Sequence, residues 1–356
     1  MMKRTARFII ASTIAYFAFS NAQKGNSKDK SKDSTNDDQI TKLFNKFKSY
    51  YSKNYNKVEE KLRFENFKFN IVNHLPQVLE ENDIINTKLN PFLDFTAQEF
   101  YDKFLKNDEN KDFLSNLVVP IEEKQARYLE EDPGYPDSFN HVSEGNVGPV
   151  ENESNNNCSL SWAFSLKGNI EGLYKLAYGP LYSLSAMQLA ECTIIPGTNC
   201  SSGRYSGIGY YYNYGLQSTS TYDFMKNIRN QCYYNPNNVV VPGGSTVRNF
   251  LQIPTNELSL KRELYNRGPI SVSFVGQWLA IYNGGIYDAN TSPFGCGQGY
   301  YYGLLVGYGK EQINNETVDY WLIKTSLPTI GDNGYVKLRR GSNQCGISNA
   351  AITVEY

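Results

Sequence analysis

Side chains that could do nucleophilic or acid–base chemistry are scarce in this sequence. It has two histidines, His74 and His141, so an imidazole base has only two sources. All six cysteines lie after residue 157, and no Cys-x-x-Cys pair occurs. An even cysteine count is typical of disulfide-bonded exported proteins, and six cysteines allow fifteen pairings. We therefore expect disulfides, no metal site and no cofactor.

Three patterned segments follow one another along the chain. They are Cys158–Ser165 (Cys-Ser-Leu-Ser-Trp-Ala-Phe-Ser), Tyr301–Gly309 (Tyr-Tyr-Gly-Leu-Leu-Val-Gly-Tyr-Gly) and Tyr320–Ser326 (Tyr-Trp-Leu-Ile-Lys-Thr-Ser). Each resembles a catalytic segment of papain-like, cathepsin L-like cysteine peptidases. In that family they read Cys-Gly-Ser-Cys-Trp-Ala-Phe-Ser, His-(Ala/Gly)-Val-three apolar-Gly-Tyr-Gly and Tyr-Trp-Leu-Val-Lys-Asn-Ser. The resemblance implies the scaffold of a papain-like peptidase.

The same resemblance identifies where the catalytic residues have changed. The nucleophilic cysteine, the histidine and the asparagine that orients it correspond to Ser161, Tyr301 and Thr325. A serine hydroxyl is a weak acid that depends on a neighbouring base. A phenol with a pKa of about 10 is protonated at neutral pH and cannot act as that base. We therefore expect that no residue of the triad is functional.

Other bases are not expected to reach Ser161. His74 lies in the N-terminal region, and His141 aligns with a residue that the family places away from the cleft. Lys167 lies six residues along a helix from Ser161 and so on another face. Lys324 precedes the asparagine-equivalent position on a strand and faces the other way. Silicatein-like proteins also have serine at the nucleophile position, but they retain the histidine.

The residue that would donate to the oxyanion has two candidate equivalents. In the family this glutamine lies three residues before the first cysteine, and here the loop before Cys158 looks two residues longer. Glu153 aligns best, and its carboxylate would repel an oxyanion. Asn155 is the alternative and could donate. The rings of Tyr300–Tyr302 indicate either a filled or repurposed cleft or ordinary tyrosines at a strand end.

The region before the peptidase segment has a signature of its own. A helix expected over 58–79 matches the first four positions of the propeptide motif Glu-x3-Arg-x3-Phe-x2-Asn, but it has His74 and Val78 where Ile and Asn are usual. A second match follows, to Asn-x-Phe-x-Asp. The matching residues are Glu59, Arg63, Phe67 and Asn70, then Asn90, Phe92 and Asp94. Two matches in this order imply an inhibitory prodomain over residues 39–115.

The remaining boundaries follow from composition. Residues 1–22 have the pattern of a secretory signal peptide, in which basic residues precede the apolar run Phe8–Phe19. This run is too short to span a bilayer. Residues 23–38 are polar and are expected to be a disordered linker. An acidic junction is expected over 116–132, and the papain-like domain over 133–356.

The resemblance also resolves the pairing of the cysteines. It implies the disulfides Cys158–Cys200, Cys192–Cys232 and Cys296–Cys345. Asn-x-Ser/Thr triplets fit a secreted surface, although we expect only some to carry glycans. They begin at Asn152, Asn157, Asn199, Asn290 and Asn315.

The expected architecture is α+β, a papain-like two-lobe fold after a helical prodomain. A helical left lobe would begin with a long helix at Ser161, and an antiparallel, barrel-like right lobe would carry Tyr301 and Thr325. The formal net charge of −1 does not indicate a nucleic-acid partner. Beyond the signal peptide, no apolar run reaches spanning length.

The expected function is that of a secreted or lysosomal pseudoprotease that acts by binding. Its candidate partners are peptides, protein substrates of active relatives, or active cathepsins. Two alternatives stay open. One is a hydrolase of this family with residual or serine-based proteolytic activity, and the other is a structural granule or matrix protein.

Overall fold

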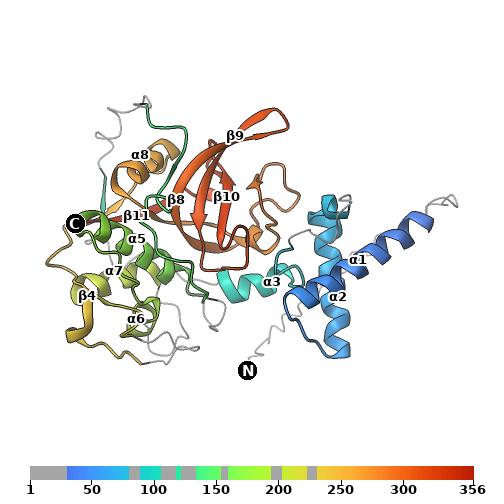
Figure 1. The fold of residues 1–356 in the computed structure, drawn as a ribbon, viewed down its shortest axis with the longest axis horizontal. Helices are drawn as coiled ribbons and strands as arrows, with labels where there is room; N and C mark the ends of the chain where they lie inside the picture. The colour runs from blue at the N-terminus through green and yellow to red at the C-terminus, as the bar shows by residue number, and fades with distance from the viewer. Residues whose placement is uncertain are drawn as a thin grey trace, which may run out of the picture.

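The computed structural model describes residues 30–79, 89–105, 118–121, 134–153, 159–193, 203–222 and 231–356, with side chains from residue 37 onward. Figure 1 shows three regions. The blue helices form the N-terminal region, green and yellow helices form one lobe, and orange and red strands form the second lobe. The expected signal peptide, residues 1–22, lies outside the described residues.

Two crossing helices, α1 (Lys30–Tyr50) and α2 (Lys57–His74), build the N-terminal region (Figure 1). Their facing sides share one buried apolar cluster. From the two helices it contains Ile40, Leu43, Phe44, Phe47, Phe67 and Ile71. Burial of these side chains holds the pair together, because short helices are marginal in water by themselves.

The two ends of α2 have clear local causes. The side chain of Asn56 caps its start by accepting from two backbone N–H groups of the first turn. The helix ends at His74 and not at residue 79, because Pro76 cannot continue an α-helix. A 3-10 turn (Pro76–Leu79) takes its place.

The start of α1 corrects the expected linker. Residues 23–38 were expected to be disordered, but α1 already begins at Lys30. Residues 30–50 contain neither proline nor glycine, so no residue breaks the helix on its N-terminal side. An ion pair at 2.6 Å joins Asp37 to Lys68 of α2. The polar segment therefore extends a helix that the apolar residues after it anchor.

A short connection leads from the N-terminal helices to the second lobe. It consists of α3 (Ala97–Phe100) and one π-helical turn (Tyr101–Leu105). Thr96 and Glu99 form a capping box at the start of α3. Figure 1 shows α3 between the N-terminal helices and the strands.

The helical lobe is built on α5 (Ser161–Tyr178), which is buried from Ser161 through Leu173. It is buried because α6 (Ala186–Cys192) and α7 (Gly203–Tyr214) pack on it from one side and the sheet of the other lobe from the opposite side. A two-stranded sheet completes this lobe, with β3 (Leu216–Gln217) and β4 (Val239–Val241).

The second lobe is one large sheet with the strand order β1-β5-β11-β6-β8-β9-β10-β7, and β2 pairs with β8. Its strands are β1 (Val118–Pro120), β2 (Phe139–Asn140), β5 (Asn249–Gln252), β6 (Ile270–Val275), β7 (Ile286–Tyr287), β8 (Tyr300–Ile313), β9 (Glu316–Lys324), β10 (Tyr335–Arg339) and β11 (Ala350–Glu355). Helix α8 (Glu257–Arg267) lies beside it (Figure 1). The α+β class is confirmed, but the sheet is not wholly antiparallel.

Two parallel pairs lie at the ends of this sheet, β10 with β7 and β1 with β5. Strand β1 belongs to the expected junction, 116–132, and pairs from Val118↔Phe250 to Pro120↔Gln252. Part of the junction is therefore held by the sheet that follows it. None of the helices in the described ranges is long and apolar enough to cross a membrane.

Candidate functional site

Ser161 is the first residue of α5, where the positive end of the helix dipole lies. Its side chain is completely buried. In the described part of the chain, its hydroxyl oxygen accepts a hydrogen bond from the backbone N–H of Tyr302 at 3.3 Å. A backbone amide cannot take a proton, so this contact holds the hydroxyl without activating it.

Tyr301 lies opposite, near the start of β8, and it is also completely buried. Its hydroxyl donates to Glu153 Oε1 at 2.8 Å and lies 2.9 Å from Ser326 Oγ. The backbone N–H of Ser326 donates to the same phenol oxygen at 3.0 Å. Burial and the adjacent Glu153 carboxylate hold the pKa of the Tyr301 phenol well above its ordinary value. The phenol is therefore a hydrogen-bond donor here and not a base.

Glu153 occupies the position at the N-terminus of α5 that an oxyanion would need. One carboxylate oxygen accepts from the Leu160 backbone N–H at 2.9 Å, and the Ser161 backbone N–H also bonds this carboxylate. The other oxygen accepts from the Ser326 hydroxyl at 2.8 Å. Burial raises the pKa of Glu153 to about 7, although hydrogen bonds from Tyr301 and Ser326 oppose the shift. Asn155, the alternative oxyanion donor, lies outside the described residues.

Thr325 does not join this network. Its hydroxyl donates to the Gly334 carbonyl at 2.8 Å and accepts from the Leu327 backbone N–H at 3.2 Å. These bonds fix the turn that follows β9. The residue that meets Tyr301 is its neighbour, Ser326, which sequence reasoning missed. One signal was available, because a buried tyrosine hydroxyl needs a partner and reaches further than an imidazole.

The two lysines considered as alternative bases are held elsewhere. Lys167 binds the carboxylates of Glu151 and Glu171 at 2.7 and 3.1 Å. Burial alone would lower the pKa of Lys167, but these carboxylates outweigh it and raise that pKa. Lys324 donates to the Gly148 carbonyl at 2.8 Å, and burial lowers the pKa of its amine to about 8. Neither amine has Ser161 among its described partners.

Both histidines lie outside the site. Asn146 donates to His141 Nδ1 at 3.1 Å, so Nε2 carries the proton and donates to the Leu264 carbonyl at 2.8 Å. Burial lowers the pKa of His141 and favours this neutral form. His74 ends α2 and packs edge-on against Phe294, with 4.9 Å between ring centroids.

The segment from Asn90 to Leu105 covers the residues around Ser161. Ser159 lies two residues before Ser161, and its hydroxyl donates to the Phe104 carbonyl at 2.6 Å. Phe104 and Leu105 are buried in the same apolar cluster as Tyr301. A Cβ on Gly299, whose φ is +73°, would meet the Tyr101 ring at 2.7 Å, so only glycine lets the connection approach this closely.

The motif residues make the other polar contacts that anchor this segment. Asn90 donates to the carbonyls of Leu279 and Tyr282, both at 2.8 Å. Two side chains of α2 bind the turn at Asp94. Asn70 donates to the Leu93 carbonyl at 2.8 Å, and Arg63 donates to the Asp94 carbonyl at 3.1 Å. The remaining motif residues act beside them: Glu59 pairs with Arg63 at 3.7 Å, and Phe67 and Phe92 are buried.

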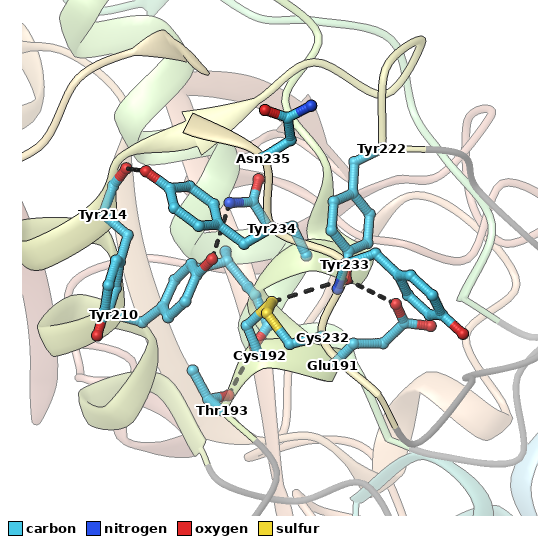
Figure 2. The surroundings of a disulfide bond; sticks show 12 residues. Glu191, Cys192, Thr193, Tyr210, Tyr214, Tyr222, Cys232, Tyr233, Tyr234 and Asn235 are labelled. Atoms are coloured by element: carbon cyan, nitrogen blue, oxygen red, sulfur yellow. Dashed lines mark hydrogen bonds between the residues drawn. A yellow bond between two sulfur atoms is a disulfide. The ribbon is translucent and has the colours of Figure 1, made fainter. Parts of the chain in front are cut away.

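Two disulfides hold the lobes, and both are pairs that the resemblance implies. Cys192–Cys232 closes a separation of 40 residues, and Cys296–Cys345 closes one of 49. Figure 2 shows Tyr222 beside the first, with a bond to Glu191. Tyr210, Tyr214 and Tyr234 form an aromatic group near it (Figure 2). The pair Cys158–Cys200 lies outside the described residues.

Comparison with known proteins agrees with this geometry. The family model described as "Papain family cysteine protease" matches residues 135–355. The chain is 32% identical to Cysteine proteinase 1 of Dictyostelium discoideum over 329 residues, which are 87% of this chain and 91% of that protein. It is also 32% identical to mouse Cathepsin 7 over 315 residues, 84% of this chain and 87% of that protein.

Solved structures with a prodomain superpose on nearly the whole chain. Digestive procathepsin L 3 of Tenebrio molitor larval midgut has a TM-score of 0.68 at 25% identity, covering 89% of this chain and 99% of that one. Procathepsin L2 from the same source has a TM-score of 0.69 at 27% identity, covering 89% and 100%. The helical N-terminal region thus occupies the place of a procathepsin prodomain.

Proposed function

Because this chain belongs to the papain family of cysteine proteases, we propose that it is a pseudoprotease of that family, which acts by binding in the secretory pathway, outside the cell or in lysosomes. The observation that carries the proposal is the hydrogen-bond network of Tyr301. Where the family has an imidazole base, this chain has a phenol bonded to Glu153 and Ser326. The N-terminal pattern of a signal peptide and the disulfides support the location.

The chemistry supports loss of catalysis at each step. Attack requires removal of a proton from Ser161, and its described partner is a backbone N–H. Charge would then develop on the carbonyl oxygen next to the N-terminus of α5, where the Glu153 carboxylate lies. Removing a single oxyanion donor already costs about 100- to 1000-fold in rate. Above about pH 7, where Glu153 is ionised, its charge adds repulsion to the loss.

One pair of residues could be considered for a serine-based mechanism. The Ser326 hydroxyl, as the nucleophile, donates to the Glu153 carboxyl group, as the base, at 2.8 Å. Ser326 and Glu153 are both buried, and Tyr301 shares the same carboxylate oxygen. A substrate carbonyl would have to displace that phenol to reach Ser326. We therefore favour binding over serine-based hydrolysis.

The partners that suit this proposal are peptides, protein substrates of active relatives, or active cathepsins. Phe104 and Leu105 of the expected prodomain are buried in the apolar cluster that also contains Tyr301. Binding of a peptide in the cleft would therefore require the prodomain to leave. A matrix or granule protein would need no such ligand, and a pull-down of the secreted form separates these functions.

The experiment that tests loss of catalysis uses the full chain after its signal peptide is removed, and the same protein cut within the 116–132 junction. Both are incubated with a fluorogenic cathepsin L peptide and with a thiol-reactive activity probe, next to an active cathepsin L. We expect turnover no higher than that of Ser161→Ala. Turnover that either Ser161→Ala or Ser326→Ala abolishes would overturn the proposal.

A further inference from the structure

The side of α2 that faces away from α1 is apolar and exposed. Val58 is 84% exposed, Leu62 55%, Phe69 59% and Val72 45%. None of these four belongs to an apolar cluster within the described residues. Exposed apolar side chains are ordinary when scattered singly, but a row of them on one helix face marks an interaction surface.

The spacing of these residues is that of a coiled-coil seam. Val58, Leu62, Glu65, Phe69 and Val72 follow one another at steps of four, three, four and three residues. With 3.6 residues per turn, the five positions fall within an arc of roughly 80°. Alternating steps of four and three are the a and d positions of a heptad, which pack against a second helix. We call these five residues the α2 seam.

The opposite side of α2 is already used. Phe67, Asn70 and Ile71 are buried against α1 and the turn at Asp94. The helix has 18 residues and is therefore about 27 Å long. The seam runs over most of this length, so it offers a partner more than two turns of continuous contact.

Charges on and beside the seam decide between partners. Glu65 lies at its centre, and Lys57 and Lys61 lie along one edge. A second copy of α2 paired over the full seam would place Glu65 against Glu65, in either orientation, and like charges at such contacts are unfavourable. A membrane surface is also unfavourable, because Glu65 would enter the acyl boundary near anionic headgroups. A foreign helix can carry the opposite charges.

We propose that the α2 seam docks an amphipathic helix of another protein, with apolar residues at heptad spacing, a basic residue facing Glu65 and acidic residues along the edge that faces Lys57 and Lys61. This site lies on the expected prodomain, on apolar side chains that stay 45–84% exposed. Binding at this site does not involve the catalytic positions, so the proposal is tested separately from the proposed loss of peptidase activity.

The test uses the full chain and a synthetic helical peptide of three heptads as the probe. The peptide has leucine at the a and d positions, lysine at the one that faces Glu65, and glutamate along the flanking edge. A second peptide has glutamate at the position that faces Glu65 and lysine along the flanking edge. Titration calorimetry should show the first peptide binding at least tenfold more tightly than the second. Glu65→Lys should reduce that preference, because Lys57 and Lys61 still favour the glutamates of the first peptide.

Variants keep the result specific to the seam. Leu62→Ser and Phe69→Ser should each weaken binding of the first peptide more than tenfold without changing the thermal midpoint, because both side chains are exposed. Leu176→Ser, an exposed leucine on α5, is the matched control and should bind as the unaltered chain does.

Three results would overturn the proposal. The first is equal binding of the two peptides or wild-type affinity of Leu62→Ser and Phe69→Ser. The second is a concentration-dependent dimer in sedimentation velocity that these variants abolish, which would make a second copy the occupant. The third is binding to vesicles of phosphatidylserine and phosphatidylcholine that these variants abolish, which would make a membrane the occupant.

Discussion

The phenol of Tyr301 donates a hydrogen bond to the carboxyl group of Glu153 over 2.8 Å, and both side chains are completely buried. They come from sequence positions 148 residues apart. Their contact joins the start of β8 to the segment that precedes α5. We expect the stability of the folded chain and its pH dependence to depend on this pair.

The first prediction concerns pH. Glu153 has a pKa of about 7 in the folded chain because of burial, against about 4.3 for an unperturbed glutamate. Between these values the native state keeps a proton that the unfolded state releases. The free energy of unfolding should therefore be largest below about pH 4 and fall as the pH rises to 7. One pKa unit is worth 1.36 kcal/mol, so the full loss, which is reached above pH 7, amounts to about 4 kcal/mol.

Urea unfolding at a series of pH values checks this, with Glu153→Gln beside it. The amide cannot ionise, so the decline between pH 4 and pH 7 should largely disappear. Glu144→Gln changes an exposed glutamate and should leave the decline intact. An unaltered slope in Glu153→Gln would show that another group causes the pH dependence.

The second prediction concerns the phenol. Tyr301→Phe keeps the ring but leaves the Ser326 N–H and one Glu153 oxygen without this partner. Unsatisfied buried groups cost about 1–3 kcal/mol each, so unfolding should become easier by an amount in this range. Tyr178→Phe is the control, because Tyr178 is 50% exposed and removal of its hydroxyl should change stability little. Equal stability of the two variants in urea would mean that the network contributes nothing.

The third prediction concerns restoration of activity. The combination Ser161→Cys, Tyr301→His and Thr325→Asn should restore little turnover in protein freed of its prodomain, because Glu153 remains at the N-terminus of α5. Adding Glu153→Gln puts an amide donor where the carboxyl group stood, so peptide turnover should then rise by about 100-fold. Adding Glu144→Gln instead should change nothing. Turnover at the level of an active cathepsin from the first three changes alone would contradict this role of Glu153.

The fourth prediction concerns the disulfides. Peptide mapping without reduction should give the two described pairs and Cys158–Cys200, with no free thiol at Cys158. Loss of one bridge should cost about 2–4 kcal/mol, and Cys192→Ser should show this because its loop of 40 residues joins α6 to the segment before β4. If Cys192→Ser were as stable as the unaltered chain, packing around Tyr222 would be enough to hold this loop without the disulfide.

Sequence patterns could predict the parts of this molecule that local rules or family motifs determine. The positions of Ser161 and Tyr301, the two described disulfides and the helical prodomain belong to this group. The partners of Tyr301 could not be predicted, because Glu153 and Ser326 meet it only through the packing of two lobes. The start of α1 at Lys30 was missed because composition indicates solvation and not the state of the backbone. Strand β1 was missed because three residues give no periodicity.

The last prediction concerns the fate of the prodomain. The proposed pseudoprotease has no activity that removal of the prodomain would release, so we expect the prodomain to stay attached in the native compartment. Three contacts support retention. Asn90 donates hydrogen bonds to two carbonyls, Phe104 packs in the apolar cluster that contains Tyr301, and strand β1 pairs with β5. N-terminal sequencing of the isolated protein should give a start at Gln23. A uniform start near Pro133 with no prodomain present would mean that it is discarded.

Cutting the purified chain within the 116–132 junction tests the same contacts in solution. The prodomain should still elute with the papain-like domain in size-exclusion chromatography. Phe104→Ala should release it, because losing a buried phenylalanine costs about 3–5 kcal/mol. Phe69→Ala, in which the ring removed is exposed, should not release it. If the unaltered prodomain separates after the cut, only the covalent link holds it, and the cleft beside Tyr301 becomes open to a ligand.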